Sequence, residues 1–247
     1  MNMREVEPRT TYALPTFSCI AEFTISHAAW TEQVVLRHAF VEEITEALDD
    51  FETIESLADE SDVETRAMVK LASFCELGDI AYFIPEFSRE AGIPLQEIFE
   101  TDDISSFEAN HQPTIDLLAS FDTADYCWAL TTTALQVVDT VNPRVETSWL
   151  WDGIPPAQRP SLAELLRNLA ITVAAGARKN GGSLADSTEA LYGKLTHRTR
   201  ENHAVKAFKE RQHDMNFDSA RDRLVPTAKS MRLVINFMRS NPDLYRS

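Results

Sequence analysis

The stretch that decides the fold reads Val34-Val-Leu-Arg-His-Ala-Phe-Val-Glu-Glu-Ile-Thr-Glu-Ala-Leu48, and its counterpart downstream is Phe74-Cys-Glu-Leu-Gly-Asp-Ile-Ala81. In both segments the apolar residues recur every three or four positions, which is the period of an amphipathic helix. The same period dominates the rest of the chain, and only seven of its 247 residues are glycine. We therefore predict an all-α protein.

Further helices are predicted on either side of these segments. The expected helices cover residues 28–57, 64–91, 114–141, 161–179, 184–208 and 218–238, with a short helix after Pro94. Pro85 is expected to kink the second helix, and Gly92 is expected to end it in a left-handed conformation. Ser161 is the expected N-cap of the fourth. Residues 101–113 are predicted to form a loop, and residues 142–160, with four prolines, an irregular connection.

The domain organisation follows from these elements. Residues 1–27 are expected to form an extended arm, residues 28–208 one all-α domain, and residues 209–247 a C-terminal helical extension. Both halves of the domain contain a helix, a glycine stop and a new helix that begins at leucine. Residues 112–208 are therefore either a degenerate second repeat or a chance recurrence of the same order of helix, glycine and helix.

Charge and hydropathy exclude several classes of protein. The net charge is −16, with 39 acidic residues against 23 Lys and Arg, which argues against a general nucleic-acid-binding surface. The longest apolar stretch, 165–177, is interrupted by polar residues, so no membrane span is expected. The N-terminus has no secretory signal pattern, and three widely spaced cysteines indicate thiols in a reducing compartment. A cytoplasmic location is predicted.

Carboxylates stand three residues apart in both segments that decide the fold. The first contains Glu42, Glu43 and Glu46, and the second contains Glu76 and Asp79. Residues with this spacing share one face of a helix, and a short link between the helices predicts an antiparallel hairpin that brings the two sets together. Charges beside a buried stripe are costly unless they are paired or bound to metal. In so acidic a chain, the other interpretation is a solvated acidic face.

Carboxylate oxygens are ligands that suit Mg²⁺ or Mn²⁺. Four of them suit more than one ion, or one ion together with a general base. The chemistry implied is attack of water on a phosphoryl group, with the ion neutralising phosphate charge and a carboxylate such as Glu43 accepting the proton.

The order of these motifs resembles a known family. Leu36-Arg37-x-x-Phe-Val-Glu42-Glu43-x-x-Glu46, then Glu76-Leu-Gly-Asp79-Ile and Arg89-Glu-Ala-Gly-Ile, is similar to the MazG-like all-α nucleoside triphosphate pyrophosphohydrolases, whose relatives include the dimeric dUTPases and dCTPases. The resemblance implies a helical bundle of that type, with a helical insertion or a degenerate second repeat. It also implies Mg²⁺-dependent cleavage of a (deoxy)nucleoside triphosphate to the monophosphate and pyrophosphate, and a homodimer or higher homo-oligomer.

The resemblance also implies roles for individual residues. Glu43, Glu46, Glu76 and Asp79 would be the metal ligands, with Glu43 and Glu46 taking part in catalysis. A partial match to a later motif of the family makes Lys194 and Arg198 candidates for contacts with phosphate, and Arg37 is a third candidate on the first helix. Leu191 stands where the family has asparagine.

Two rival functions remain open at this point. One is a non-catalytic all-α interaction or assembly protein that docks through the basic tail after Lys194. The other is a nucleotide binder that has lost catalysis, which is suggested by Leu191. Trp149 and Trp151, in the proline-rich connection, would either stack on a base or cover an edge of the core.

Overall fold

The computed structural model describes residues 16–18, 20–21, 33–57, 63–141, 150–151 and 153–191, with the backbone alone at 33–39 and 63–68. The elements are α2 (Gln33–Ser56), α3 (Val63–Ala91), α4 (Leu95–Ile98), α5 (Ile104–Ala119), α6 (Thr123–Val141), the 3-10 turn η2 (Pro156–Gln158) and α7 (Leu162–Lys179). Residues 184–191 are also helical. Within these residues the only extended pairing is an isolated bridge between Thr16 and Asp103. The predicted all-α class is confirmed.

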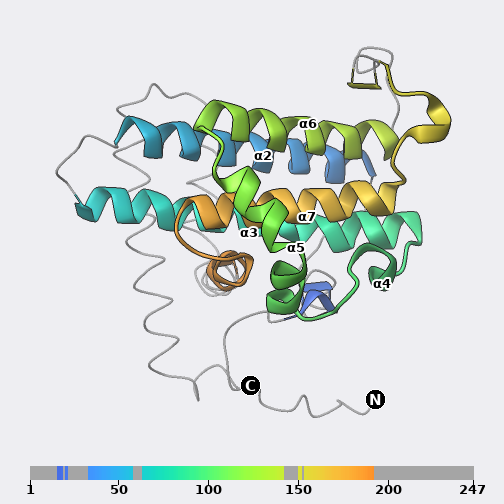
Figure 1. The fold of residues 1–247 in the computed structure, drawn as a ribbon, viewed down its shortest axis with the longest axis horizontal. Coiled ribbons are helices and arrows are strands. Elements are labelled where there is room, and N and C mark those ends of the chain that lie inside the picture. The colour runs from blue at the N-terminus through green and yellow to red at the C-terminus, as the bar shows by residue number, and fades with distance from the viewer. Residues whose placement is uncertain are drawn as a thin grey trace, which may run out of the picture.

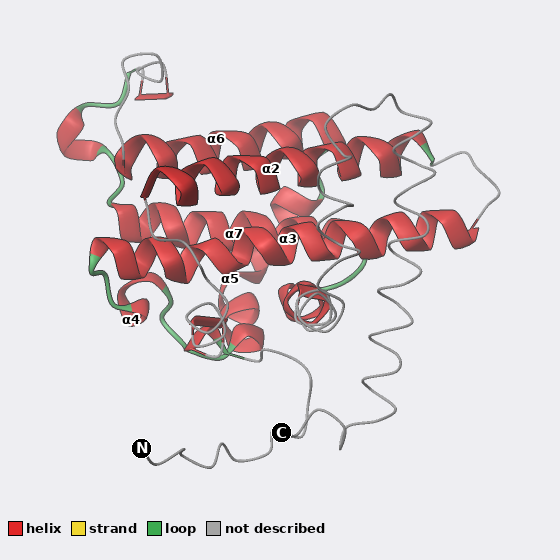
Figure 2. Cartoon of the chain, turned by 180° about the vertical axis from the view of Figure 1, so that it is seen from behind, coloured by secondary structure: helices red, strands yellow, loops and turns green. Residues whose placement is uncertain are grey.

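Four long helices form the body of the molecule in two layers. Figures 1 and 2 show α2 beside α6 in one layer and α3 beside α7 in the other, with all four axes nearly aligned. Each helix packs on its neighbour in the same layer and on a helix of the other layer, and α5 crosses the outer side of α7. Among the described helices, none combines the length and the apolar character that crossing a bilayer requires.

The core is continuous through both layers. Phe40 on α2 is fully buried, and its ring lies edge-on to Phe83 and Phe87 of α3 at centroid distances of 5.6 and 5.1 Å. The longest apolar run of the sequence, residues 165–177, forms the buried middle of α7, where it contacts α3, α5 and α6. These contacts place α7 at the centre of the bundle.

Most of the helix limits predicted from the sequence agree with the structure. α3 ends at Ala91, and Gly92 follows with a φ of 68°, the left-handed conformation expected of it. Ser161 caps α7 in a reciprocal capping box with Glu164. α3 continues through Pro85 as one helix from Val63 to Ala91, and the kink expected at Pro85 stays a prediction.

The predictions for residues 101–113 and 114–141 were wrong. Instead of a loop and one long helix, the chain forms α5, a short turn at residues 120–122, and then α6. The carboxylate of Asp103 caps α5 by accepting a hydrogen bond from the Ser106 amide at 2.7 Å. Pro113 lies on the exposed side of this helix, where the carbonyl that its ring leaves unpaired can bind water.

The turn between α5 and α6 is held by local and distant contacts. The carboxylate of Asp122 accepts a hydrogen bond from the Asp125 amide at 2.8 Å and so starts α6. The ammonium group of Lys179, at the end of α7, donates to the carbonyl of Phe121 at 2.5 Å. Because the second contact depends on a helix 58 residues away, the local pattern gave no sign of it.

The described part of the predicted N-terminal arm is docked on α5 and on the chain just before it. Residues 17–18 and 20–21 are helical. Phe17 stacks on Phe99 at a centroid distance of 3.5 Å, and its amide donates to the carbonyl of Asp102. Ile20 is fully buried. The rest of 1–27, the continuation of the helix at 184–208 and the extension at 209–247 lie outside the described residues.

We predict that Gly176→Ala destabilises the bundle. Tyr126 is fully buried on α6, donates to the carbonyl of Thr172 at 3.0 Å, and lies so close to Gly176 that an added Cβ would overlap the hydroxyl oxygen. Overpacking of this kind costs about 1–3 kcal/mol of unfolding free energy, measured by urea denaturation. Adding Tyr126→Phe to Gly176→Ala removes the overlapping oxygen and should recover part of the loss; strictly additive effects of the two substitutions would contradict this explanation.

Candidate metal centre

The candidate centre lies between the first two long helices. α2 and α3 run antiparallel as predicted (Figure 1), and the aromatic contacts of Phe40 fix how far one is shifted along the other. Glu43 and Glu46 lie about one turn and nearly two turns of α2 beyond Phe40, and Glu76 lies about two turns of α3 before Phe83. The hairpin therefore brings carboxylates from both helices to the same level of the interface.

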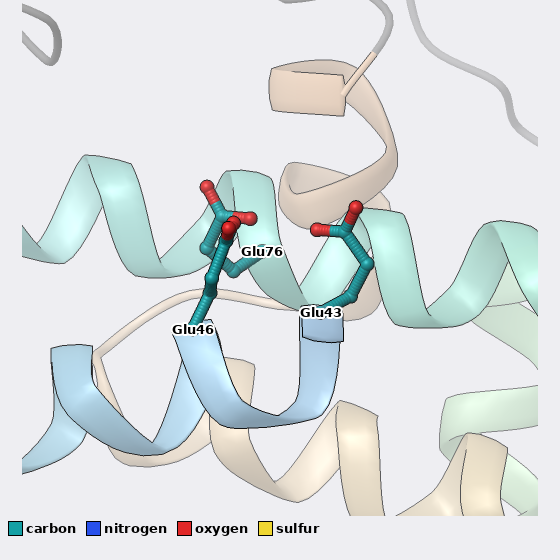
Figure 3. A group of neighbouring side chains, drawn as sticks. All are labelled: Glu43, Glu46 and Glu76. Carbon is teal, nitrogen blue, oxygen red and sulfur yellow. The ribbon is translucent and has the colours of Figure 1, made fainter. Parts of the chain in front are cut away.

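Three carboxylates meet there. Glu43, Glu46 and Glu76 each offer one oxygen, and these oxygens all lie within 4.8 Å of one another. Figure 3 shows Glu43 and Glu46 projecting from α2 toward α3, and Glu76 projecting from α3 beside Glu46. Glu43 is the most deeply placed, with 7% of its surface exposed, while the other two are half-buried.

The electrostatics of this arrangement favour a cation. Two like charges at that separation repel by about 3 kcal/mol at an effective dielectric constant of 20. A divalent cation would convert this repulsion into attraction. The donor set fits Mg²⁺ or Mn²⁺, because it consists of carboxylate oxygens alone and because three protein ligands leave coordination positions for water and phosphate.

Asp79, predicted as a fourth ligand, is not among the oxygens that the structure brings together. It lies one turn beyond Glu76 on α3 and is 8% exposed. Burial raises the pKa of Tyr82, and the charges of Glu86 and Asp79 raise it further. The carboxylate of Asp79 therefore lies close enough to Tyr82 to act on its hydroxyl electrostatically. Its side chain is also one carbon shorter than that of glutamate. Asp79 as a ligand stays a prediction.

The three predicted cationic contacts are not tested by the structure. Arg37 lies on the second turn of α2, where the backbone alone is described. Lys194 and Arg198 come after Leu191, the last described residue. They remain candidates from the sequence.

Leu191 itself is a core residue. Its side chain is fully buried and packs on α3, so that a Cβ added at Gly78 would lie 2.8 Å from the Cβ of Leu191. The position at which the family resemblance places an asparagine therefore faces the interior. One signal of this contact was present in the sequence, namely a glycine in the middle of a helix, between Glu76 and Asp79.

Trp151 covers an edge of the core. It is 6% exposed, its indole N–H donates to the carboxylate of Asp139, and the guanidinium of Arg159 lies over its ring at 5.1 Å. Of the two interpretations of this tryptophan, the structure supports the structural one. Trp149 lies outside the described residues.

Comparison of the chain with protein-family models, with curated proteins and with solved structures found no match. The resemblance in motif order therefore stays a prediction, and the geometry of the three carboxylates is the observation from which function is argued.

We predict that the protein binds Mn²⁺, and that Glu46→Gln and Glu76→Gln each weaken this binding at least about tenfold, because each removes one charged ligand. Mn²⁺ titration followed by electron paramagnetic resonance measures the dissociation constant. Glu52→Gln is the matched control, since Glu52 is an exposed acid on the same helix outside the cluster. Equal losses in all three variants would indicate a diffuse effect of net charge and not a site.

We predict that Leu191→Asn destabilises the protein by about 2–5 kcal/mol, because it loses apolar burial and places an amide in an apolar contact. Thermal and urea unfolding measure the loss. Leu191→Met conserves volume and should cost less than about 1.5 kcal/mol. A stable Leu191→Asn protein would show that this position is not held in the core.

Proposed function

We propose that this protein is a Mg²⁺-dependent hydrolase that converts a (deoxy)nucleoside triphosphate to the monophosphate and pyrophosphate. The observation that supports the proposal is the convergence of Glu43, Glu46 and Glu76 from two consecutive antiparallel helices within 4.8 Å. The order of the acidic motifs, which resembles that of the MazG-like enzymes, narrows the substrate to a nucleoside triphosphate. On this proposal the three carboxylates are metal ligands and not part of a solvated acidic face.

Each carboxylate has a role that follows from its burial. Glu46 and Glu76 are half-buried and so lie on the open side of the cluster, where they would hold the ion and leave room for phosphate oxygens. A bound Mg²⁺ would supply neutralisation of phosphate charge and a more acidic water. Glu43 lies deeper. One of its oxygens would contact the ion, and the other would accept the proton of the water.

The reaction conserves atoms and charge without a further reactant. The water oxygen forms a bond to phosphorus, the P–O bond of the α–β anhydride breaks, and pyrophosphate leaves with the bonding electrons. The proton of the water passes to a carboxylate, for which Glu43 is the candidate. Asp79 as a further ligand, and Lys194, Arg198 and Arg37 as phosphate contacts, belong to the same proposal on sequence grounds. So does assembly into a homo-oligomer.

A nucleotide binder without turnover is the second candidate. The buried Leu191 favours it, because the residue that would stand there in the family is replaced by a side chain packed against Gly78. Such a protein would keep the metal centre and bind a nucleotide without cleaving it.

The deciding experiment is pyrophosphate release from a panel of ribo- and deoxyribonucleoside triphosphates with Mg²⁺. We expect release from at least one nucleotide, and a fall in kcat of roughly 10²–10⁴-fold in Glu43→Gln, which removes the proton acceptor. Glu52→Gln should leave the rate unchanged. Nucleotide binding without release would favour the second candidate. If the protein neither binds nor cleaves any nucleotide, the hydrolase and the nucleotide binder are both ruled out. The non-catalytic interaction protein is then the remaining candidate.

A further inference from the structure

The helix at residues 184–191 crosses α3 at a glycine. In Figure 1 this helix, orange, is seen nearly end-on while α3 lies horizontal, so the two axes are close to perpendicular. The crossing point is Gly78, where an added Cβ would lie 2.5 Å from the carbonyl oxygen of Ser187 and 2.8 Å from the Cβ of Leu191. Ser187 and Leu191 are both fully buried. The two backbones therefore approach as closely as a missing side chain allows.

A second contact attaches the chain to α3 just before this helix, at the end of α7. The side-chain amide of Asn180 donates to the hydroxyl of Ser73 at 2.8 Å, and both residues are buried. Ser73 lies between one and two turns of α3 from Gly78. The chain is thus attached to α3 both before and at the crossing, which restricts how the helix can tilt.

Gly78 and Glu76 lie on nearly opposite sides of α3. Two residues correspond to about 200° of rotation about a helix axis, so Glu76 points toward α2 while Gly78 points toward the crossing helix. On the α2 side, Phe40 already packs against the rings of Phe83 and Phe87. α3 is therefore held between the aromatic contact with α2 on one side and the backbone contact with the helix at 184–191 on the other.

We propose that Gly78 is a positioning residue for the metal centre, because its missing side chain sets how deep α3 lies between α2 and the crossing helix, and hence how far Glu76 stands from Glu43 and Glu46. This inference rests on the proposed function, from which it takes the metal centre. A glycine in mid-helix is unfavourable relative to alanine, and the close crossing gives its presence here a structural reason.

The physical link is the narrow tolerance of metal ligands. Coordinating side chains must be held within about 0.5 Å of their working positions. A methyl group at Gly78 would meet a helical carbonyl oxygen at 2.5 Å, and a backbone atom cannot rotate away as a side chain can. α3 would have to shift or turn, and Glu76 would move with it.

The test compares two glycines in the folded protein. Gly78→Ala should weaken Mn²⁺ binding at least about tenfold, measured by electron paramagnetic resonance and by the rise in Tm that saturating Mn²⁺ produces. Gly176→Ala is the matched control, since it also inserts a methyl group at a crowded helix crossing, but on α7 and against the side chains of Tyr126 and Phe51 and not against a backbone. It should lower Tm while leaving the Mn²⁺ dissociation constant unchanged.

The outcomes separate this inference from the proposed function. If the wild-type protein binds no Mn²⁺, the metal centre and both proposals fall. If the wild type binds and folded Gly78→Ala binds equally well, the positioning role alone is overturned, and it is also overturned if Gly176→Ala loses as much affinity. Should Gly78→Ala fail to fold, Leu191→Gly removes the Cβ that faces Gly78 and so loosens the same crossing without adding a methyl group, and unchanged Mn²⁺ affinity in that variant would refute the role.

Discussion

The packing of Phe40 against Phe83 and Phe87 is the interaction on which the other features depend. It aligns α2 and α3 so that three carboxylates of like charge stand at one level, each pair repelling by about 3 kcal/mol. Burial of one phenylalanine contributes roughly 1.5–3 kcal/mol, which is about as much as one of the three pairwise repulsions. A bound cation would turn the repulsion among the three carboxylates into attraction and so stabilise the hairpin.

Two glycines let the surrounding helices close on this hairpin. Gly176 lets α7 approach Tyr126 of α6, and Gly78 lets the helix at 184–191 lie directly on α3. In both places a backbone replaces a side chain at the point of contact. At these two points the helices approach more closely than a methyl group would allow. α3 is confined on three sides by α2, α7 and the crossing helix.

The sequence was sufficient for features that depend on a local period or a local cap. The apolar stripe of α2 and the ends of α3 and α7 are of this kind, and the convergence of Glu43, Glu46 and Glu76 followed once a short link implied an antiparallel pair. Features decided by distant contacts were not accessible. The loop predicted for residues 101–113 is mostly helix, with Pro113 on its exposed side, and the turn at 120–122 is held by Lys179 from another helix. The separation of Asp79 from the cluster depends on side-chain reach, which spacing alone does not give.

The docking of Phe17 on Phe99 and Phe107 has a consequence for synthesis of the chain. Ser18 pairs with Asp102, which is 84 residues away. At about 5–20 residues per second, the ribosome needs several seconds to supply the partners of this segment after the segment itself has been made. During that interval Phe17 and Ile20 have no core to enter, and the loop that must then close is long. The contacts of this segment are therefore completed late, and until then its apolar side chains stay accessible to a nascent-chain chaperone.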